Sequence, residues 1–221
     1  MLKRRVEALS KCAVRVGHLI SVRGRHARQA IRNLRSNLEN NTDSNTCATL
    51  VLMRPPEISE YQSFYAKYIS LVEGDDLTEI LDQQLTDSLA TLCRISEAKS
   101  LHRYEPGKWS IKELLGHLID SERIFTYRAL RFARNDHTPL SGFDQDPYVI
   151  AGSFDDRPWS ELVAEFEHLR RSTMLFFRGL KPEAAGRFGV ANNAPITVRA
   201  LGYVIAGHEL HHLGILREKY L

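Results

Sequence analysis

Histidines are concentrated near the end of the sequence, in the stretch AGHELHHLGILREKYL. His208, His211 and His212 fall within five residues, and His208-Glu209-x-x-His212 has the spacing of the HExxH metallopeptidase helix. Two imidazoles four residues apart lie on the same side of a helix and can bind one cation. The stretch therefore predicts a peptidase site, another kind of metal site, or a helix whose histidines are structural.

Two of these histidines belong to a row of positions that would face one side of a helix. The row has alternating spacings of four and three residues and consists of Leu201, Ile205, His208, His212, Ile215 and Lys219. This spacing is typical of the buried side of a packed helix. We therefore expect His208 and His212 to face the core, with His211 one position beside the row.

A third histidine, His117, occurs much earlier, in the stretch LLGHLIDSER. Its neighbours Leu114 and Leu118 place it on the apolar side of another helix, where a histidine bonded to a carboxylate would also fit. Three imidazoles buried together without partners would be costly to desolvate, whereas one divalent metal ion satisfies all three. We therefore predict a metal site formed by His117, His208 and His212.

The elements that must position these histidines are four amphipathic helices. They are expected at about residues 75–97, 110–134, 158–179 and 197–221. The second helix begins with a capping box, Ser110-Ile-Lys-Glu113, and the third has Pro158 at a first helical position. The first helix carries one row of leucines: Leu77, Leu81, Leu85, Leu89 and Leu92.

These helices predict an all-α protein, because no segment shows the alternating pattern of a strand. The long connection DHTPLSGFDQDPYVIAGSFDD between the second and third helices is compatible with a four-helix bundle, in which metal sites form between facing helices. Three glycines in the last helix predict close approach of a neighbouring helix or a ligand: Gly202, Gly207 and Gly214.

The composition of the 221 residues is that of a soluble protein, with 43% hydrophobic residues. No segment approaches the roughly 20 consecutive apolar residues of a membrane span. Cys12, Cys47 and Cys93 are an odd number without paired spacing, so we expect no disulfide framework and a cytoplasmic location. The expected partners are a small-molecule substrate and a second copy of the chain, without nucleic acid or a membrane.

Charge is distributed unevenly along the chain. Residues 1–52 have ten Lys and Arg against three Asp and Glu, whereas residues 53–221 have 20 against 24. The mildly acidic second segment argues against nucleic-acid binding by the main domain. The basic first segment fits a transit-like presequence, a basic arm, or a gene start placed too early, with translation beginning at Met53. We treat it as an extension of a domain covering residues 53–221.

Three stretches, in this order and at these separations, resemble the DinB-like superfamily of four-helix-bundle metalloenzymes, which includes YfiT. They are KWSIKELLGHLIDSERIFTYRALRFARND, LSGFDQDPYV and AGHELHHLGILREKYL, and the resemblance extends from about Tyr65 to Leu221. It implies a divalent metal, most often nickel or zinc, bound by His117, His208 and His212. Because some members transfer low-molecular-weight thiols and others are described as hydrolases, the resemblance implies a thiol S-transferase or a small-molecule hydrolase.

The catalytic base is not identified by the sequence. Three imidazole ligands leave a coordination position open for a water or a thiol. Asp120 and Glu122 lie close to His117 in the sequence and would orient an imidazole, move a proton, or remain solvated charges of the helix. Trp109, Tyr148 and the loop GFDQD are expected to border the substrate pocket.

Two alternatives remain at this point. In a metallopeptidase, Glu209 would be the general base, but Glu218, the only downstream candidate for a third ligand, would face away from the pair on a continuous helix. In a non-enzymatic helical bundle, the same three histidines would form a structural or a vestigial metal site. Turnover of small molecules and its dependence on Glu209 distinguish these alternatives from the transferase or hydrolase.

Overall fold

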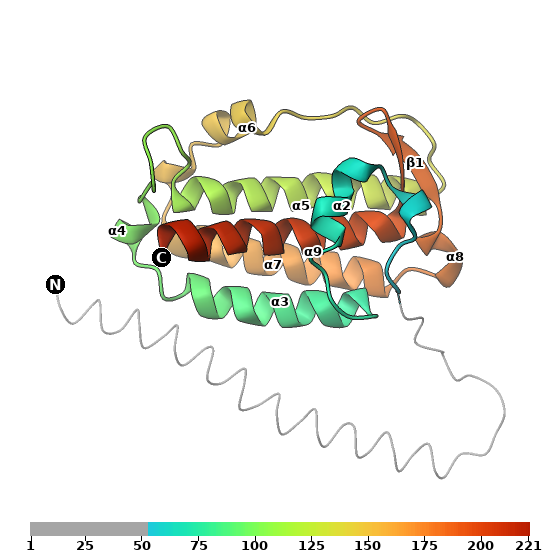
Figure 1. Cartoon of the computed structure of the whole chain (residues 1–221), viewed down its shortest axis with the longest axis horizontal. Coiled ribbons are helices and arrows are strands. Elements are labelled where there is room, and N and C mark those ends of the chain that lie inside the picture. The colour runs from blue at the N-terminus through green and yellow to red at the C-terminus, as the bar shows by residue number, and fades with distance from the viewer. Residues whose placement is uncertain (1–52) are drawn as a thin grey trace, which may run out of the picture. The chain divides into compact units, whose positions relative to one another are not determined.

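The computed structural model describes residues 53–221. Its main elements are four long helices, which lie side by side in Figure 1: α3 (Leu77–Leu92), α5 (Ile111–Ala133), α7 (Trp159–Arg178) and α9 (Val198–Ile215). Helices α3 and α5 each pack against both α7 and α9. This arrangement confirms the predicted four-helix bundle. The predictions for residues 1–52 lie outside the described residues.

Side-chain caps fix where three of these helices begin. The carboxylate of Asp76 accepts a hydrogen bond from the Thr78 amide before α3, and the hydroxyl of Thr197 accepts one from the Ala200 amide before α9. Ser110 and Glu113 form the predicted capping box. Each cap satisfies a backbone donor that has no partner within the helix.

The first helix is shorter than expected. Helix α3 ends at Leu92, and a separate short helix, α4 (Glu97–Ser100), begins after the N-cap residue Ser96. The leucine row of α3 nevertheless faces the core, with Leu89 half-buried and the other four buried. The last few residues of the predicted helix, after Leu92, therefore lie between α3 and α4.

Several short elements precede or connect the long helices. They are η1 (Ile58–Glu60), α2 (Ser63–Ile69), α6 (Gln145–Gly152), η2 (Phe154–Asp156) and α8 (Pro182–Ala185). Helix α2 packs against α9, while α6 and η2 pack against α5. The long connection predicted between the second and third helices thus contains two short helices of its own.

The expectation that the chain has no strands is wrong. Strands β1 (Phe188–Ala191) and β2 (Ala194–Thr197) form an antiparallel hairpin beside the bundle. Asn192 and Asn193 both have positive φ, of 52° and 60°, as a two-residue hairpin turn requires. Strands of four residues are too short to show a clear alternating pattern.

The last helix also departs from the expected regular form. Helix α9 ends at Ile215 and continues as a π-helical turn, η3 (Leu216–Tyr220). This turn buries Tyr220 and leaves Lys219 exposed, so Lys219 does not belong to the buried row. None of the helices in residues 53–221 is both long and apolar enough to cross a membrane.

Candidate metal centre

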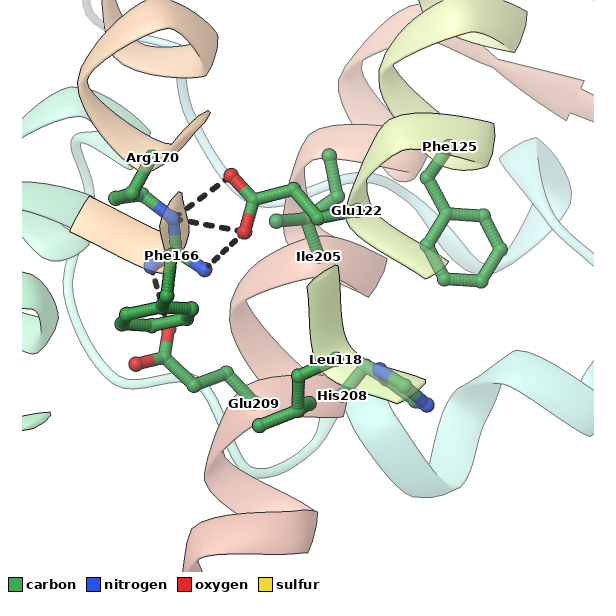
Figure 2. A pocket seen from close by; sticks show the side chains of 8 residues that line it. All are labelled: Leu118, Glu122, Phe125, Phe166, Arg170, Ile205, His208 and Glu209. Atoms are coloured by element: carbon green, nitrogen blue, oxygen red, sulfur yellow. Dashed lines mark hydrogen bonds and ion pairs between the residues drawn. The ribbon is translucent and has the colours of Figure 1, made fainter. Parts of the chain in front are cut away.

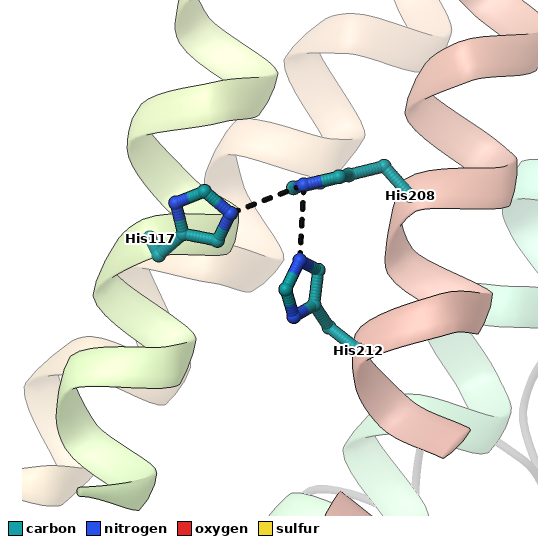
Figure 3. Close-up of side chains that lie close together, drawn as sticks. All are labelled: His117, His208 and His212. Carbon is teal, nitrogen blue, oxygen red and sulfur yellow. Dashed lines mark hydrogen bonds between the residues drawn. The ribbon is translucent and has the colours of Figure 1, made fainter. Parts of the chain in front are cut away.

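The three predicted histidine ligands meet between α5 and α9. The Nε2 atom of His208 lies 3.1 Å from Nε2 of His117 and 3.1 Å from Nε2 of His212. One nitrogen from each of the three side chains lies within 4.8 Å of the others. Figure 3 shows the three rings turned toward one another from the two helices. The structure therefore brings together residues that are 91 positions apart in sequence.

The geometry of this cluster fits a divalent cation. Zinc–nitrogen bonds of ~2.0–2.1 Å in a tetrahedral site place ligand nitrogens roughly 3.4 Å apart, close to the two observed separations. Ser121 Oγ lies 3.5 Å from Nδ1 of His117. A proton on Nδ1 can be donated to this hydroxyl, which leaves the lone pair of Nε2 for a metal.

Burial keeps the three imidazoles in the neutral form that binds metals. It lowers the pKa of His117 to about 4. Burial and the charges of neighbouring residues, of which His117 contributes most, lower the pKa of His212 to about 3. The pKa of His208 is also well below its usual value, mainly because of burial. All three are therefore deprotonated at neutral pH, as metal coordination requires.

Aromatic side chains surround the three ligands. The ring of Tyr68, from α2, meets His208 edge to face with a centroid separation of 5.2 Å. Phe125 contacts the same imidazole, and Trp109 lies 4.9 Å from the ring of His117. These contacts restrict the rotation of two of the ligands and exclude water from part of the site.

The close packing of α9 depends on two of its glycines. A Cβ atom at Gly207 would overlap the backbone of Tyr68, and one at Gly202 would overlap the side chain of Leu77. The prediction of close approach is therefore confirmed at these positions. No neighbouring helix approaches Gly214, where a Cβ atom would meet nothing within 4 Å.

A buried network of charged groups lies on the other side of His208. The guanidinium of Arg170, from α7, donates hydrogen bonds of 2.8–3.2 Å to both carboxylate oxygens of Glu122 and also bonds Glu209. Ser88, from α3, donates to the second oxygen of Glu209. Figure 2 shows both carboxylates directed toward Arg170. This Arg170 network, consisting of Ser88, Glu122, Arg170 and Glu209, joins all four long helices.

The network shows the surroundings of the acidic residues that the sequence offered as catalytic candidates. Glu122 is 3% exposed, so its interpretation as a solvated charge is wrong. The carboxylate of Glu209 is held by Arg170 and Ser88 and faces away from the histidines, which leaves the peptidase arrangement without its base. Glu218 is exposed and pairs with Lys219. Asp120 is half-buried and lies 3.7 Å from Arg123.

A cavity of about 380 Å³ opens beside His212. Its walls comprise parts of segment 104–109, Leu114, Gln145, Asp146, Ile215 and Tyr220. The hydroxyl of Tyr220 donates a 2.8 Å hydrogen bond to the carbonyl oxygen of Trp109, which fixes one wall. Trp109 and the last two residues of GFDQD, Gln145 and Asp146, line the cavity as expected, whereas Tyr148 packs against Phe143 and is not part of the lining.

Sequence reasoning missed Arg170, Ser88 and Tyr68 as parts of the site. Arg170 carries a detectable signal, because it lies four residues after the buried Phe166 and three before the buried Thr173. A charged residue on the apolar side of a helix requires a buried partner of opposite charge. Glu122 and Glu209 occupy comparable positions in their own helices, so these three residues could have been matched by charge.

The fold and the three-histidine cluster define a helical bundle built around a candidate metal centre. Comparison of the sequence with protein families identifies the same kind of protein. The family model described as the DinB superfamily matches residues 80–216. The chain belongs to the DinB superfamily. This finding confirms the family resemblance inferred from the sequence.

Two known proteins illustrate this relationship. A protein of Oceanobacillus iheyensis, named "putative metal-dependent hydrolase", is 26% identical over 129 residues, which cover 58% of this chain and 73% of the relative. The solved structure of YfiT from Bacillus subtilis matches with a TM-score of 0.55 and 18% identity, covering 74% of this chain and 89% of YfiT. YfiT is described as "a probable metal-dependent hydrolase with an unusual four-helix bundle topology". At this identity the structural match concerns the fold.

Proposed function

We propose that this protein is a metal-dependent hydrolase of small molecules, in which His117, His208 and His212 bind one divalent cation. The proposal is carried by the convergence of three buried imidazoles, with two Nε2 separations of 3.1 Å, beside an open cavity. The names of both relatives, which refer to metal-dependent hydrolases, support the choice of reaction.

The dimensions and lining of the cavity support a small substrate. Its volume of about 380 Å³ falls within the range of roughly 300–1,000 Å³ that is typical of small-molecule sites. Trp109, Tyr104 and Tyr220 provide aromatic surface, while Lys108 and Asp146 provide charges of opposite sign. A ligand in this cavity would therefore bind by aromatic contacts and be oriented by a few polar groups.

The chain's residues would position a substrate for reaction at the metal site. A divalent cation bound by three imidazoles supplies Lewis-acid chemistry, which activates a water or a thiol near neutral pH. His212 belongs to both the ligand cluster and the cavity wall, so a substrate reaches the centre from the side of His212. Ser121 and Trp109 orient His117 from two directions.

Nickel and zinc are the cations that we propose, because imidazole nitrogen is a suitable ligand for both. The experiment is to load the full-length protein with either metal and measure the bound metal by elemental analysis. The loaded protein is then assayed with small esters and amides, with and without low-molecular-weight thiols. We expect about one metal ion per chain and hydrolysis that needs no thiol.

Matched histidine variants make this test specific. Alanine substitution at His117, His208 or His212 should remove the bound metal and the activity. His168→Ala, an exposed histidine of α7, should change neither. Equal metal content in all four variants would contradict the ligand assignment. Turnover that strictly requires a thiol would replace the hydrolase with the thiol S-transferase that the family resemblance also implies.

A further inference from the structure

The Arg170 network carries more negative than positive charge. It contains one guanidinium and two carboxylates, and the side chains of Arg170, Glu122 and Glu209 are 1%, 4% and 1% exposed. Burial alone would lower the pKa of Arg170, but the charges of Glu122 and Glu209 raise it above its usual value. The formal charge of these three side chains is therefore −1.

The two carboxylates are fixed in place and cannot meet a substrate. Both oxygens of Glu122 accept hydrogen bonds from Arg170, and the oxygens of Glu209 are shared between Arg170 and Ser88. The cavity that contains His212 does not include either carboxylate in its lining. Their role therefore depends on their charge and on the side chains to which they are bonded.

The network is close to the proposed metal ligands. Glu209 follows His208 directly in α9, and Glu122 follows Ser121, the hydroxyl that contacts His117. His208, Glu122, Arg170 and Glu209 line the same enclosed cavity of about 10 Å³, which is roughly the space for one water. Charges in such a buried position interact more strongly than charges on the surface, because little solvent screens them.

A surplus buried charge is unfavourable unless an opposite charge compensates it. We propose that Glu122 and Glu209 supply the negative charge that strengthens binding of a divalent cation at the three histidines, and that Arg170 positions both carboxylates. The neutral imidazoles bring no charge of their own, and Glu122 and Glu209 are the only buried carboxylates among the described residues. The inference rests on the proposed metal site and assigns Glu209 a role other than that of a general base.

The experiment compares metal affinity in full-length wild-type protein with that in Glu209→Gln and Glu122→Gln. Each substitution keeps the size of the side chain and removes one negative charge. We expect the Kd for Zn²⁺, measured with a competing chelator, to rise by about 10- to 100-fold, as for other groups that support metal ligands. The rise in Tm on adding Zn²⁺ should shrink accordingly.

The change in Tm separates this role from a purely structural ion pair. A structural pair predicts that the metal-free and metal-bound forms lose the same stability, so that the Kd for Zn²⁺ stays unchanged. That outcome in both glutamine variants, with wild type binding normally, would overturn the inference and leave the metal site intact. Absence of Zn²⁺ binding in wild type would instead reject the proposed metal site itself.

A matched control is available on α7. Glu165 pairs with Arg123 and Arg157 and is 22% exposed, so Glu165→Gln removes the same charge from a partly exposed position outside the network. The Kd of the Glu165→Gln variant for Zn²⁺ should equal that of wild type. An equal weakening in Glu165→Gln would show that net charge of the whole protein, rather than the buried network, sets the affinity. If one of the two buried variants does not fold, the other provides the same test.

Discussion

The two sides of His208 are lined by different kinds of side chain. On one side, the Arg170 network is enclosed, and its charged groups bond one another. On the other side, beyond His212, aromatic rings and isolated charges surround an open cavity of about 380 Å³. Charged groups that already bond one another can influence a metal ion only through their charge. Recognition of a substrate needs side chains that can still form hydrogen bonds or ion pairs with it. The following experiments test this division of roles.

The largest effect is expected for Arg170→Met. This substitution leaves two buried carboxylates without their cation, which should lower the free energy of unfolding by roughly 3–5 kcal/mol. Arg171→Met is the matched control, because Arg171 forms only a partly exposed pair with Glu167 and should cost at most about 1 kcal/mol. Urea denaturation measures both. Similar losses in the two variants would remove the distinction between the enclosed network and the surface.

The second-largest effect is expected for a substitution at the contact of α2 with α9. Gly207→Ala would place a methyl group against the backbone of Tyr68 and should lower the free energy of unfolding by about 1–3 kcal/mol. Gly214→Ala should have the opposite sign, with a gain of up to ~1 kcal/mol from helix propensity, because its surroundings are open. Thermal unfolding checks the pair, and a stabilised Gly207→Ala variant would refute the close packing over His208.

A smaller effect is expected on the cavity side. Lys108→Gln should raise KM for anionic substrates by about 5-fold, equivalent to ~1 kcal/mol, and Asp146→Asn should lower it. Neither change should alter the bound metal, since neither residue belongs to the ligand cluster. Steady-state kinetics and elemental analysis provide the two measurements. Loss of metal in either variant would show that the two sides of His208 are not independent.

The smallest effect concerns a partly exposed ion pair at the start of α9. Burial alone would raise the pKa of Glu60, but hydrogen bonds from Arg199 and Thr197 outweigh it and hold the pKa below its usual 4.5. A lowered pKa stabilises the folded state above pH 4.5, and this contribution disappears as the pH falls through the folded pKa. Wild type should therefore exceed Glu60→Gln by about 0.5–1 kcal/mol at pH 7 and lose this advantage in acid. Urea titrations at several pH values check this; an unchanged difference in acid would contradict it.

The long helices and the histidine cluster could be predicted because their signals are local. Capping residues such as Ser110 mark a helix start, and the spacing of His208 and His212 marks a buried face. His117 followed from the cost of burying imidazoles without a partner. Each of these arguments needs only a few neighbouring residues and one physical rule.

The remaining features depend on contacts between distant segments. Arg170, Glu122 and Glu209 can be matched by the sign of their charges, but the hydrogen bonds that they form depend on how three helices pack together. The hairpin at residues 188–197 is too short for periodicity, and the π-helical turn at the end of α9 has no local signature. The HExxH spacing likewise does not indicate which neighbours the side chain of Glu209 meets.

The placement of the ligands and the cavity walls on different elements has a consequence for how such proteins diversify. The three histidines are carried by the regular helices α5 and α9. Much of the cavity wall comes instead from segment 104–109 and from the first turn of α6, at Gln145 and Asp146. Loops accept substitutions and insertions more readily than packed helices. Descendants of one ancestral bundle can therefore acquire new substrates by changing these short segments while they inherit the same metal chemistry.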